Sequence, residues 1–204
     1  MSSSRFTKGL IALALGVIAA CGPESPRTPV APIDASTPAV SAPSMSRSTK
    51  AKGKLNGLQW QKALKADVSA SAVIGPEGGV LALPATGLRL VVPAGAVSRP
   101  TPFRATAVAG RLVAYDFEPA GSTFPVPLRV EQDLSFLDLK HVDTSALTAG
   151  YFPTRAELDQ QLLTGHVAEV ISTAPSTSAL TFPVWHFSGY LIGWGFTSDA
   201  SGAY

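Results

Sequence analysis

Residues 71–92 read SAVIGPEGGVLALPATGLRLVV, and this stretch decides the expected fold. Three short apolar runs (SAVI, VLAL and LRLVV) alternate with the turn sequences GPEGG and PATG. Short aliphatic runs bounded by Gly and Pro are typical of strands. Gly78 and Gly79 permit the positive φ of a tight hairpin turn. The third run should end before Pro93, because proline has no N–H to donate to a ladder. The stretch therefore predicts successive β-hairpins.

The same alternation of short apolar runs and turn sequences continues toward the C-terminus. Further strand candidates lie at 103–110, 112–119, 127–134, 149–152, 165–173 and 179–195. Many short strands with closely spaced turns are typical of an antiparallel sandwich. One segment, TRAELDQQLL at 154–163, has a capping box of Thr154 and Glu157 and predicts a short helix. We expect an all-β domain over 66–197, an antiparallel β-sandwich with one short helix, followed by a flexible tail at 198–204.

The N-terminus reads MSSSRFTKGLIALALGVIAACG. Arg5 and Lys8 precede an apolar run at 9–20, a layout typical of a signal peptide and too short to span a bilayer. The run ends in IAAC, which resembles the lipobox of bacterial lipoproteins. This resemblance implies cleavage after Ala20 and acylation of Cys21. An ordinary signal peptide with a chance cysteine is the alternative.

Cys21 is the single cysteine of the sequence, so no intramolecular disulfide can form. Lipidation accounts for an unpaired thiol in an exported chain, and several acyl chains anchor firmly because each buried CH₂ adds about 0.8 kcal/mol. We therefore expect a lipid anchor in the bacterial cell envelope, with the bilayer as a partner through acylated Cys21. Gly22 follows the cysteine, and resemblance to enterobacterial sorting signals favours the outer membrane.

Residues 21–65 are expected to form a disordered tether ahead of the sandwich. The part at 22–48 is rich in Pro, Ser, Ala and Thr and has no aromatic residue, so it cannot bury enough apolar surface to order itself. The part at 47–65, RSTKAKGKLNGLQWQKALK, is basic and has no acidic residue. We interpret it as a solvated, partly helical lead-in to the domain. An amphipathic segment lying on anionic lipid is the alternative.

The charge of the chain gives no argument for a nucleic-acid partner. The sequence has 16 Lys and Arg against 14 Asp and Glu, and removal of residues 1–20 takes away two of the basic ones, Arg5 and Lys8, which leaves no net charge. A neutral chain has no global attraction to nucleic acid. The three histidines are far apart in the sequence and no cysteine pair exists. We therefore expect neither a metal site nor a cofactor.

Three blocks, at 74–83, 87–108 and 115–134, resemble the "ZU-five" domain, which zona occludens proteins, Unc-five netrin receptors and ankyrins share. The positions in register with its pattern are Gly75, Gly78, Gly79, Val92, Pro93, Gly95, Ala96, Phe117, Pro119, Gly121, Phe124 and Pro127. The resemblance implies a β-sandwich that serves as an interaction module. We expect Phe117 and Phe124 to hold the loop between them against the core.

The last strand candidate contains His186-Phe187-Ser188. Some animal relatives of the domain carry His-Phe-Ser near its end and cut themselves there. The resemblance implies Ser188 as nucleophile on the Phe187 carbonyl and His186 as general base. The alternative that we favour is a plain final strand with a bulge near residues 183–184. That strand would place four side chains on its outer face: His186, Ser188, Tyr190 and Ile192.

We therefore expect a membrane-anchored cell-envelope lipoprotein whose β-sandwich binds an envelope protein or polysaccharide and catalyses no reaction. Self-processing between Phe187 and Ser188 is one alternative function. A carbohydrate-binding module is the second, because Tyr190 and Trp194 share a strand face and aromatic rings can stack on sugars.

Overall fold

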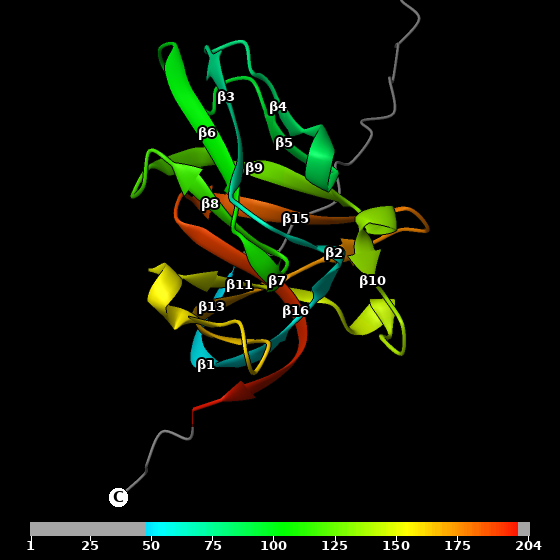
Figure 1. Ribbon diagram of the computed structural model, residues 1–204. Coiled ribbons are helices and arrows are strands. Elements are labelled where there is room, and N and C mark those ends of the chain that lie inside the picture. The colour runs from blue at the N-terminus through cyan, green and yellow to red at the C-terminus, as the bar shows by residue number, and fades with distance from the viewer. Residues whose placement is uncertain (1–47, 200–204) are drawn as a thin grey trace, which may run out of the picture. The chain divides into compact units, whose positions relative to one another are not determined.

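The computed structural model describes residues 48–199; the signal sequence, Cys21, the tether up to residue 47 and the tail from residue 200 lie outside them. Residues 71–92 form the strands that their pattern predicts (Figure 1): β3 (Val68–Ile74), β4 (Gly79–Leu83) and β5 (Leu88–Val92). Gly78 has a φ of 82° in the first turn, and β5 ends immediately before Pro93. The hairpin glycine and the proline stop are both confirmed.

Three antiparallel sheets make up the fold. The largest, in spatial order, contains β1 (Thr49–Gly57), β13 (Thr164–Ser172), β11 (Thr148–Phe152), β16 (Gly189–Ser198), β8 (Ala114–Glu118), β6 (Thr101–Ala107) and β3, with β12 (Leu158–Asp159) beside β13. The second contains β14 (Ala174–Pro175), β15 (Ala179–His186), β9 (Thr123–Asp133), β5 and β4. The third contains β10 (Leu137–Asp138), β2 (Gln59–Leu64) and β7 (Gly110–Leu112). Within residues 48–199, four single 3₁₀ turns lie between strands, at Pro84–Thr86, Leu134–Phe136, Thr144–Ala146 and Arg155–Glu157.

The main core lies between the eight-stranded and the five-stranded sheets. Alternation along β5 shows how the sequence builds it, because Leu88, Leu90 and Val92 are buried while Arg89 is exposed and pairs with Glu131 of β9. Side chains of both sheets join one buried cluster. Removal of each large aliphatic side chain from water contributes about 1.5–3 kcal/mol. The predicted all-β antiparallel sandwich is confirmed.

The domain begins earlier than the sequence predicted, because β1 and β2 occupy residues assigned to the tether. Along β1 the lysines at 50, 52 and 54 are exposed, while Gly53 and Leu55 between and after them are buried. This is the period of a strand and not of a helix. Leu58 and Trp60 are also buried in the main core. The expected boundary at residue 66 is therefore wrong, and the described part of the basic segment is folded sheet.

β1 closes part of the large sheet into a ring. It pairs with β13 on one side and with β16 on the other, and β11 links those two strands. The ring surrounds a second, smaller core that includes Leu55, Phe152 and Leu191. The approach of β16 to β1 is close: a Cβ on Gly193 would lie 2.0 Å from the backbone oxygen of Asn56. Only glycine fits at that position of the ring.

The helix predicted at 154–163 is absent, which corrects the capping-box prediction. Thr154 makes no side-chain cap, and the segment forms one 3₁₀ turn followed by β12. Tertiary contacts hold it in this form. The side-chain Oε1 of Gln160 accepts the backbone N–H of Arg111 at 2.9 Å, and its side-chain Nε2 donates to the Ala109 carbonyl at 3.2 Å. Arg155 pairs with Asp67 and Asp116. These contacts fasten the segment to neighbouring strands in a geometry that a helix could not supply.

Candidate functional site

The candidate site predicted at His186-Phe187-Ser188 lies where the chain passes from one sheet to the other. β15 ends at His186 in the five-stranded sheet, and β16 begins at Gly189 in the eight-stranded sheet. The register of β15 against β9 shifts between Val184 and His186, so the irregularity predicted near residues 183–184 is present one step later. The expected single final strand is wrong, because the crossing divides it in two.

Backbone hydrogen bonds fix this crossing to the loop at 119–122. The N–H of Phe187 donates to the Ser122 carbonyl at 2.8 Å, and the N–H of Gly121 donates to the Phe187 carbonyl at 2.9 Å. The N–H of Phe117 donates to the Ser188 carbonyl at 2.9 Å. The carbonyl groups of Phe187 and Ser188 therefore each accept a backbone hydrogen bond, and the Phe187 N–H donates one.

The Phe187 ring fills the end of the main core and is 1% exposed. It packs on Phe124 with ring centroids 4.8 Å apart, on Phe103 at 5.3 Å and on Phe117 at 5.5 Å. Aromatic pairs at such distances add to the stability gained from area burial alone. Phe117 and Phe124 thus hold their loop against the core, as predicted, and Phe187 is the third member of that contact.

His186 belongs to a small polar cluster with partners from other strands. Its Nε2 lies 3.3 Å from Oε2 of Glu169 on β13, and its ring meets the edge of Tyr151 with centroids 4.6 Å apart. The hydroxyl of Ser48 donates to the same Glu169 oxygen at 2.6 Å. Glu169 therefore joins the point where the chain enters the domain to the end of β15.

Tyr190 completes this cluster from β16. Its hydroxyl donates to the backbone carbonyl of His186. Burial raises the pKa of the Tyr190 phenol, and the nearby Glu169 carboxylate raises it further. The phenol therefore stays protonated and acts as a fixed donor. No pattern in the sequence gives a reason to select Glu169 or Ser48. The two residues are 121 positions apart, and His186 lies on a different strand from Glu169.

Ser188 has different partners from His186. Its hydroxyl donates to the carbonyls of Phe152, the last residue of β11, at 3.4 Å and of Pro153, the next residue, at 3.3 Å. These are long hydrogen bonds. The expected outer strand face, with His186 and Ser188 as neighbours, is not formed. Two of its four predicted members are in fact buried, since Tyr190 is 1% and Ile192 is 0% exposed.

The arrangement holds one element of peptide-cleavage chemistry and separates the others. A backbone donor, Gly121 N–H, lies on the Phe187 carbonyl, where a developing oxyanion would need one. A nucleophile and a base must also share a hydrogen bond. Here the Ser188 hydroxyl points to β11 carbonyls and the His186 imidazole is beside Glu169. The Ser188 hydroxyl and the His186 imidazole thus have separate hydrogen-bond partners.

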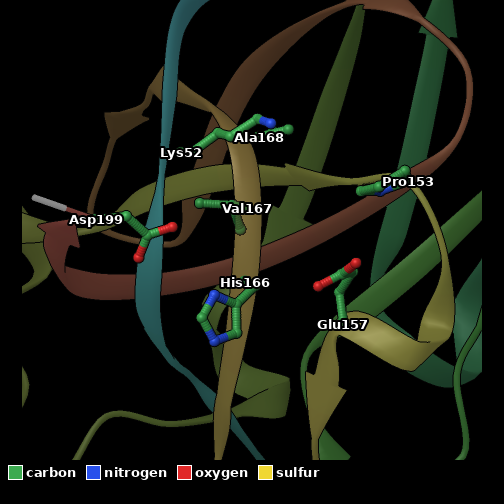
Figure 2. Close-up of a pocket in the computed structure, with 7 residues that line it drawn as sticks. All are labelled: Lys52, Pro153, Glu157, His166, Val167, Ala168 and Asp199. Carbon is green, nitrogen blue, oxygen red and sulfur yellow. The ribbon is translucent and has the colours of Figure 1, made fainter. Parts of the chain in front are cut away.

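A shallow cleft of about 220 Å³ lies beside β13. It is lined by Lys52, Pro153, Glu157, His166, Val167, Ala168 and Asp199. Figure 2 shows the His166 imidazole between the Asp199 and Glu157 carboxylates in projection. Among residues 48–199 no group of three or more His, Cys, Asp or Glu is placed to hold a metal ion. The cleft combines charges of both signs and has no buried reactive group.

The aromatic surface that the carbohydrate-binding alternative requires, formed by Tyr190 and Trp194 together, is not present. Tyr190 is buried and its ring packs against Phe117 and Phe182, with centroids 5.8 and 6.1 Å away. Only Trp194 of the proposed pair is partly exposed. The two rings cannot together form a surface for a sugar.

Comparison with protein families gives one match, to the ZU5 domain, over residues 70–130. The chain carries a ZU5-like domain. The matched segment of the ZU5-like domain runs from β3 into β9 and supplies strands to all three sheets. It contains Phe117, Gly121 and Phe124, the residues that hold the Phe187 crossing. A comparison with curated proteins found no match to the chain.

The strands outside the matched segment complete the sheets to which its strands belong. β1 and β2 precede it, and the strands from β10 to β16 follow it, and each belongs to a sheet that also contains matched strands. Within residues 48–199 no helix is long and apolar enough to cross a membrane.

Proposed function

We propose that the protein is a lipid-anchored lipoprotein of the bacterial cell envelope, whose ZU5-like domain binds another protein or an envelope polymer without catalysing a reaction. The observation that carries the binding role is the ZU5 match over residues 70–130, since this domain suggests a protein-interaction module. A fold class by itself does not define a function. The proposal therefore rests on the matched segment together with the chemistry of the N-terminal sequence.

The anchoring part of the proposal rests on Cys21. A basic n-region, an apolar run and the sequence IAAC lie in the order that acylation requires. The sandwich begins at Thr49. Residues 22–48 would then separate the acylated cysteine from the domain, and a proline-rich chain extends by up to about 3.1 Å per residue. This reach would place the domain well clear of the lipid headgroups, most simply at the outer membrane.

Acylation is tested by growing bacteria that express the full chain with an alkyne fatty acid. Labelled protein should appear in the membrane fraction. Cys21→Ser should abolish both the label and the shift in mass, whereas Ser48→Ala, outside the lipobox, should keep them. An unlabelled wild-type chain in the soluble fraction would overturn the anchor.

The binding role is tested by cross-linking in intact envelopes. The full chain and a chimaera that keeps residues 1–47 but carries an unrelated domain are compared. A partner captured by the full chain alone supports the ZU5-like domain as the binding module. A partner captured equally by both would assign binding to the N-terminal segment and contradict the proposal.

The non-catalytic part of the proposal is supported by the separate partners of Ser188 and His186. Denaturing mass spectrometry of the full chain should show residues 188–204 still attached after prolonged incubation. Ser188→Ala should give the same intact pattern. Release of this C-terminal fragment from the wild type but not from Ser188→Ala would establish self-processing instead.

A further inference from the structure

The free edge of β3 is the longest unpaired edge in the described part of the chain. β3 ends the eight-stranded sheet, and all seven of its residues pair with β6 without any irregularity. Among residues 48–199 no strand pairs with its other side. That side offers a row of backbone N–H and C=O groups, which is a template for another strand.

The sequence of β3, VSASAVI, has none of the features that usually protect an edge. It contains no charged residue and no proline, and its pairing has no bulge. Val73 is 71% exposed, and Val80 on the adjoining strand β4 is 45% exposed. Natural proteins normally place lysine, proline, a bulge or a very short strand at such an edge.

Most of the other ends of the sheets are protected by a very short strand or by pairing. β14 has two residues, one of them Pro175, and β10 has two residues. β1 carries exposed lysines and is paired on both sides. β4 is a free edge of five residues, and the turn at residues 75–78 joins it directly to β3 (Figure 1). The unprotected edges are thus gathered on one side of the sandwich.

We propose that the β3 edge pairs antiparallel with the same edge of a second copy of this chain, so that the two large sheets continue into one. This inference does not depend on the lipid anchor. Full overlap of the seven residues requires a two-fold axis at Ser71, the middle residue of β3. Val68 of one copy then lies opposite Ile74 of the other, and no pair of like charges meets along the strand. A two-fold interface of this kind closes after two copies.

Charge complementarity outside the strand supports a second copy as the occupant. Lys65 and Glu77 are each six residues from Ser71 and lie just beyond the two ends of β3. The antiparallel arrangement therefore brings the Lys65 end of one copy to the Glu77 end of the other. Both side chains are exposed, and neither is in the ion pairs found within residues 48–199. The two-fold axis makes this contact twice. A register chosen only to overlap the strands thus also brings opposite charges together.

Cross-linking of the full chain tests the position of the axis. Cys21→Ser removes the natural cysteine, and Ser71→Cys then places one cysteine at the predicted axis. Mild oxidation should give a reducible dimer at low micromolar concentration. The matched control is Ser172→Cys, also an exposed serine of the large sheet but on β13, where it pairs with Thr148 of β11. Equal cross-linking of the two variants, or none at Ser71→Cys, would overturn the inference.

Sedimentation of the full Cys21→Ser chain in mild detergent tests the pairing itself. Ser71→Lys opposes two lysines across the axis and should weaken dimerisation at least about tenfold, whereas Ser172→Lys should leave it unchanged. Lys65→Glu and Glu77→Lys should each weaken it about three- to tenfold, and the double variant should recover most of the loss. A monomeric wild type at 100 µM concentration, about the upper range of such measurements, would contradict the proposal. So would association that Ser71→Lys leaves intact, since that association would come from elsewhere in the chain.

Discussion

Phe187 and Phe124 meet edge to face with ring centroids 4.8 Å apart, so the last crossing between the sheets is packed on the loop that the ZU5 match contains. Gly121 and Ser122 of the same loop exchange backbone hydrogen bonds with Phe187. Phe124 and Phe187 are 63 positions apart in the sequence. Within the sequence His-Phe-Ser, the central residue Phe187 thus has a structural role, because it packs the crossing against this loop.

Phe187→Ala should destabilise the domain by about 3–5 kcal/mol, because it removes a fully buried ring and leaves a cavity among three other aromatic rings. Urea unfolding followed by tryptophan fluorescence measures the change. Ser188→Ala is the matched control and should cost less than about 1 kcal/mol, since its hydroxyl makes only long hydrogen bonds. Equal effects of the two substitutions would contradict the assigned role of the ring.

A chain that begins at residue 66 should fail to fold, whereas one that begins at residue 48 should fold. The shorter piece lacks Leu55, Leu58 and Trp60, which are 0%, 1% and 6% exposed, and it opens the ring that β1 closes. Amide chemical-shift dispersion in an NMR spectrum of each piece provides the measurement. A well-dispersed spectrum from the shorter piece would show that the strands before residue 66 are dispensable.

Gly193→Ala should destabilise the domain by about 2–3 kcal/mol, because the new methyl group would meet the Asn56 backbone oxygen at 2.0 Å and the strands would have to separate. Thermal unfolding detects the loss. Gly79→Ala is the control: it has an ordinary φ, and its nearest neighbour is the Ile74 side chain at 3.3 Å. It should change stability by less than about 1 kcal/mol. A harmless Gly193→Ala would refute the tight approach of β1 and β16.

Asp67→Asn should destabilise the protein at neutral pH but not in acid. The Ala109 N–H and the Arg155 side chain hold the pKa of the Asp67 carboxyl below its usual value. A carboxyl with a lowered folded-state pKa adds stability above its unfolded pKa of about 3.9, and that stability is lost as the pH falls through the folded-state value. Because Asp67 is largely exposed, the effect at neutral pH should be about 1 kcal/mol or less.

Unfolding curves of wild type and Asp67→Asn between pH 7 and about pH 3 give the measurement. The difference between the two proteins should shrink as the solution becomes acidic. Glu118→Gln removes an exposed carboxylate from nearby β8 and serves as the control. A difference that grew toward low pH would reverse the expected sign and contradict the assigned contacts.

The strands with strong local patterns could be predicted from the sequence, and the long-range features could not. Residues 71–92 carry their turns and their alternation within a few neighbours, so β3, β4 and β5 follow directly. The segment at 154–163 has a helical capping pattern, but Arg155 and Gln160 find partners on distant strands. Tertiary contact overrides local preference there.

The β1 region shows a signal that the sequence did contain. In KAKGKLNG at residues 50–57, lysines alternate with small or apolar residues, which is the period of a half-buried strand. Its charge and glycines favoured the interpretation as a linker. The polar cluster around Glu169 was out of reach, because Ser48, Glu169 and His186 come together only when three strands are in place. Side chains so far apart in sequence carry no local pattern.

The pairing of β1 on both flanks has a mechanical consequence. Tension on the chain ahead of Thr49 would pull along β1, parallel to its axis, while β13 and β16 hold it from either side. Backbone bonds perpendicular to such a load must break together in shear, since the strand cannot unzip from one free margin. A domain attached through its N-terminal end would therefore be loaded along β1, the strand that is hydrogen-bonded to β13 on one side and to β16 on the other.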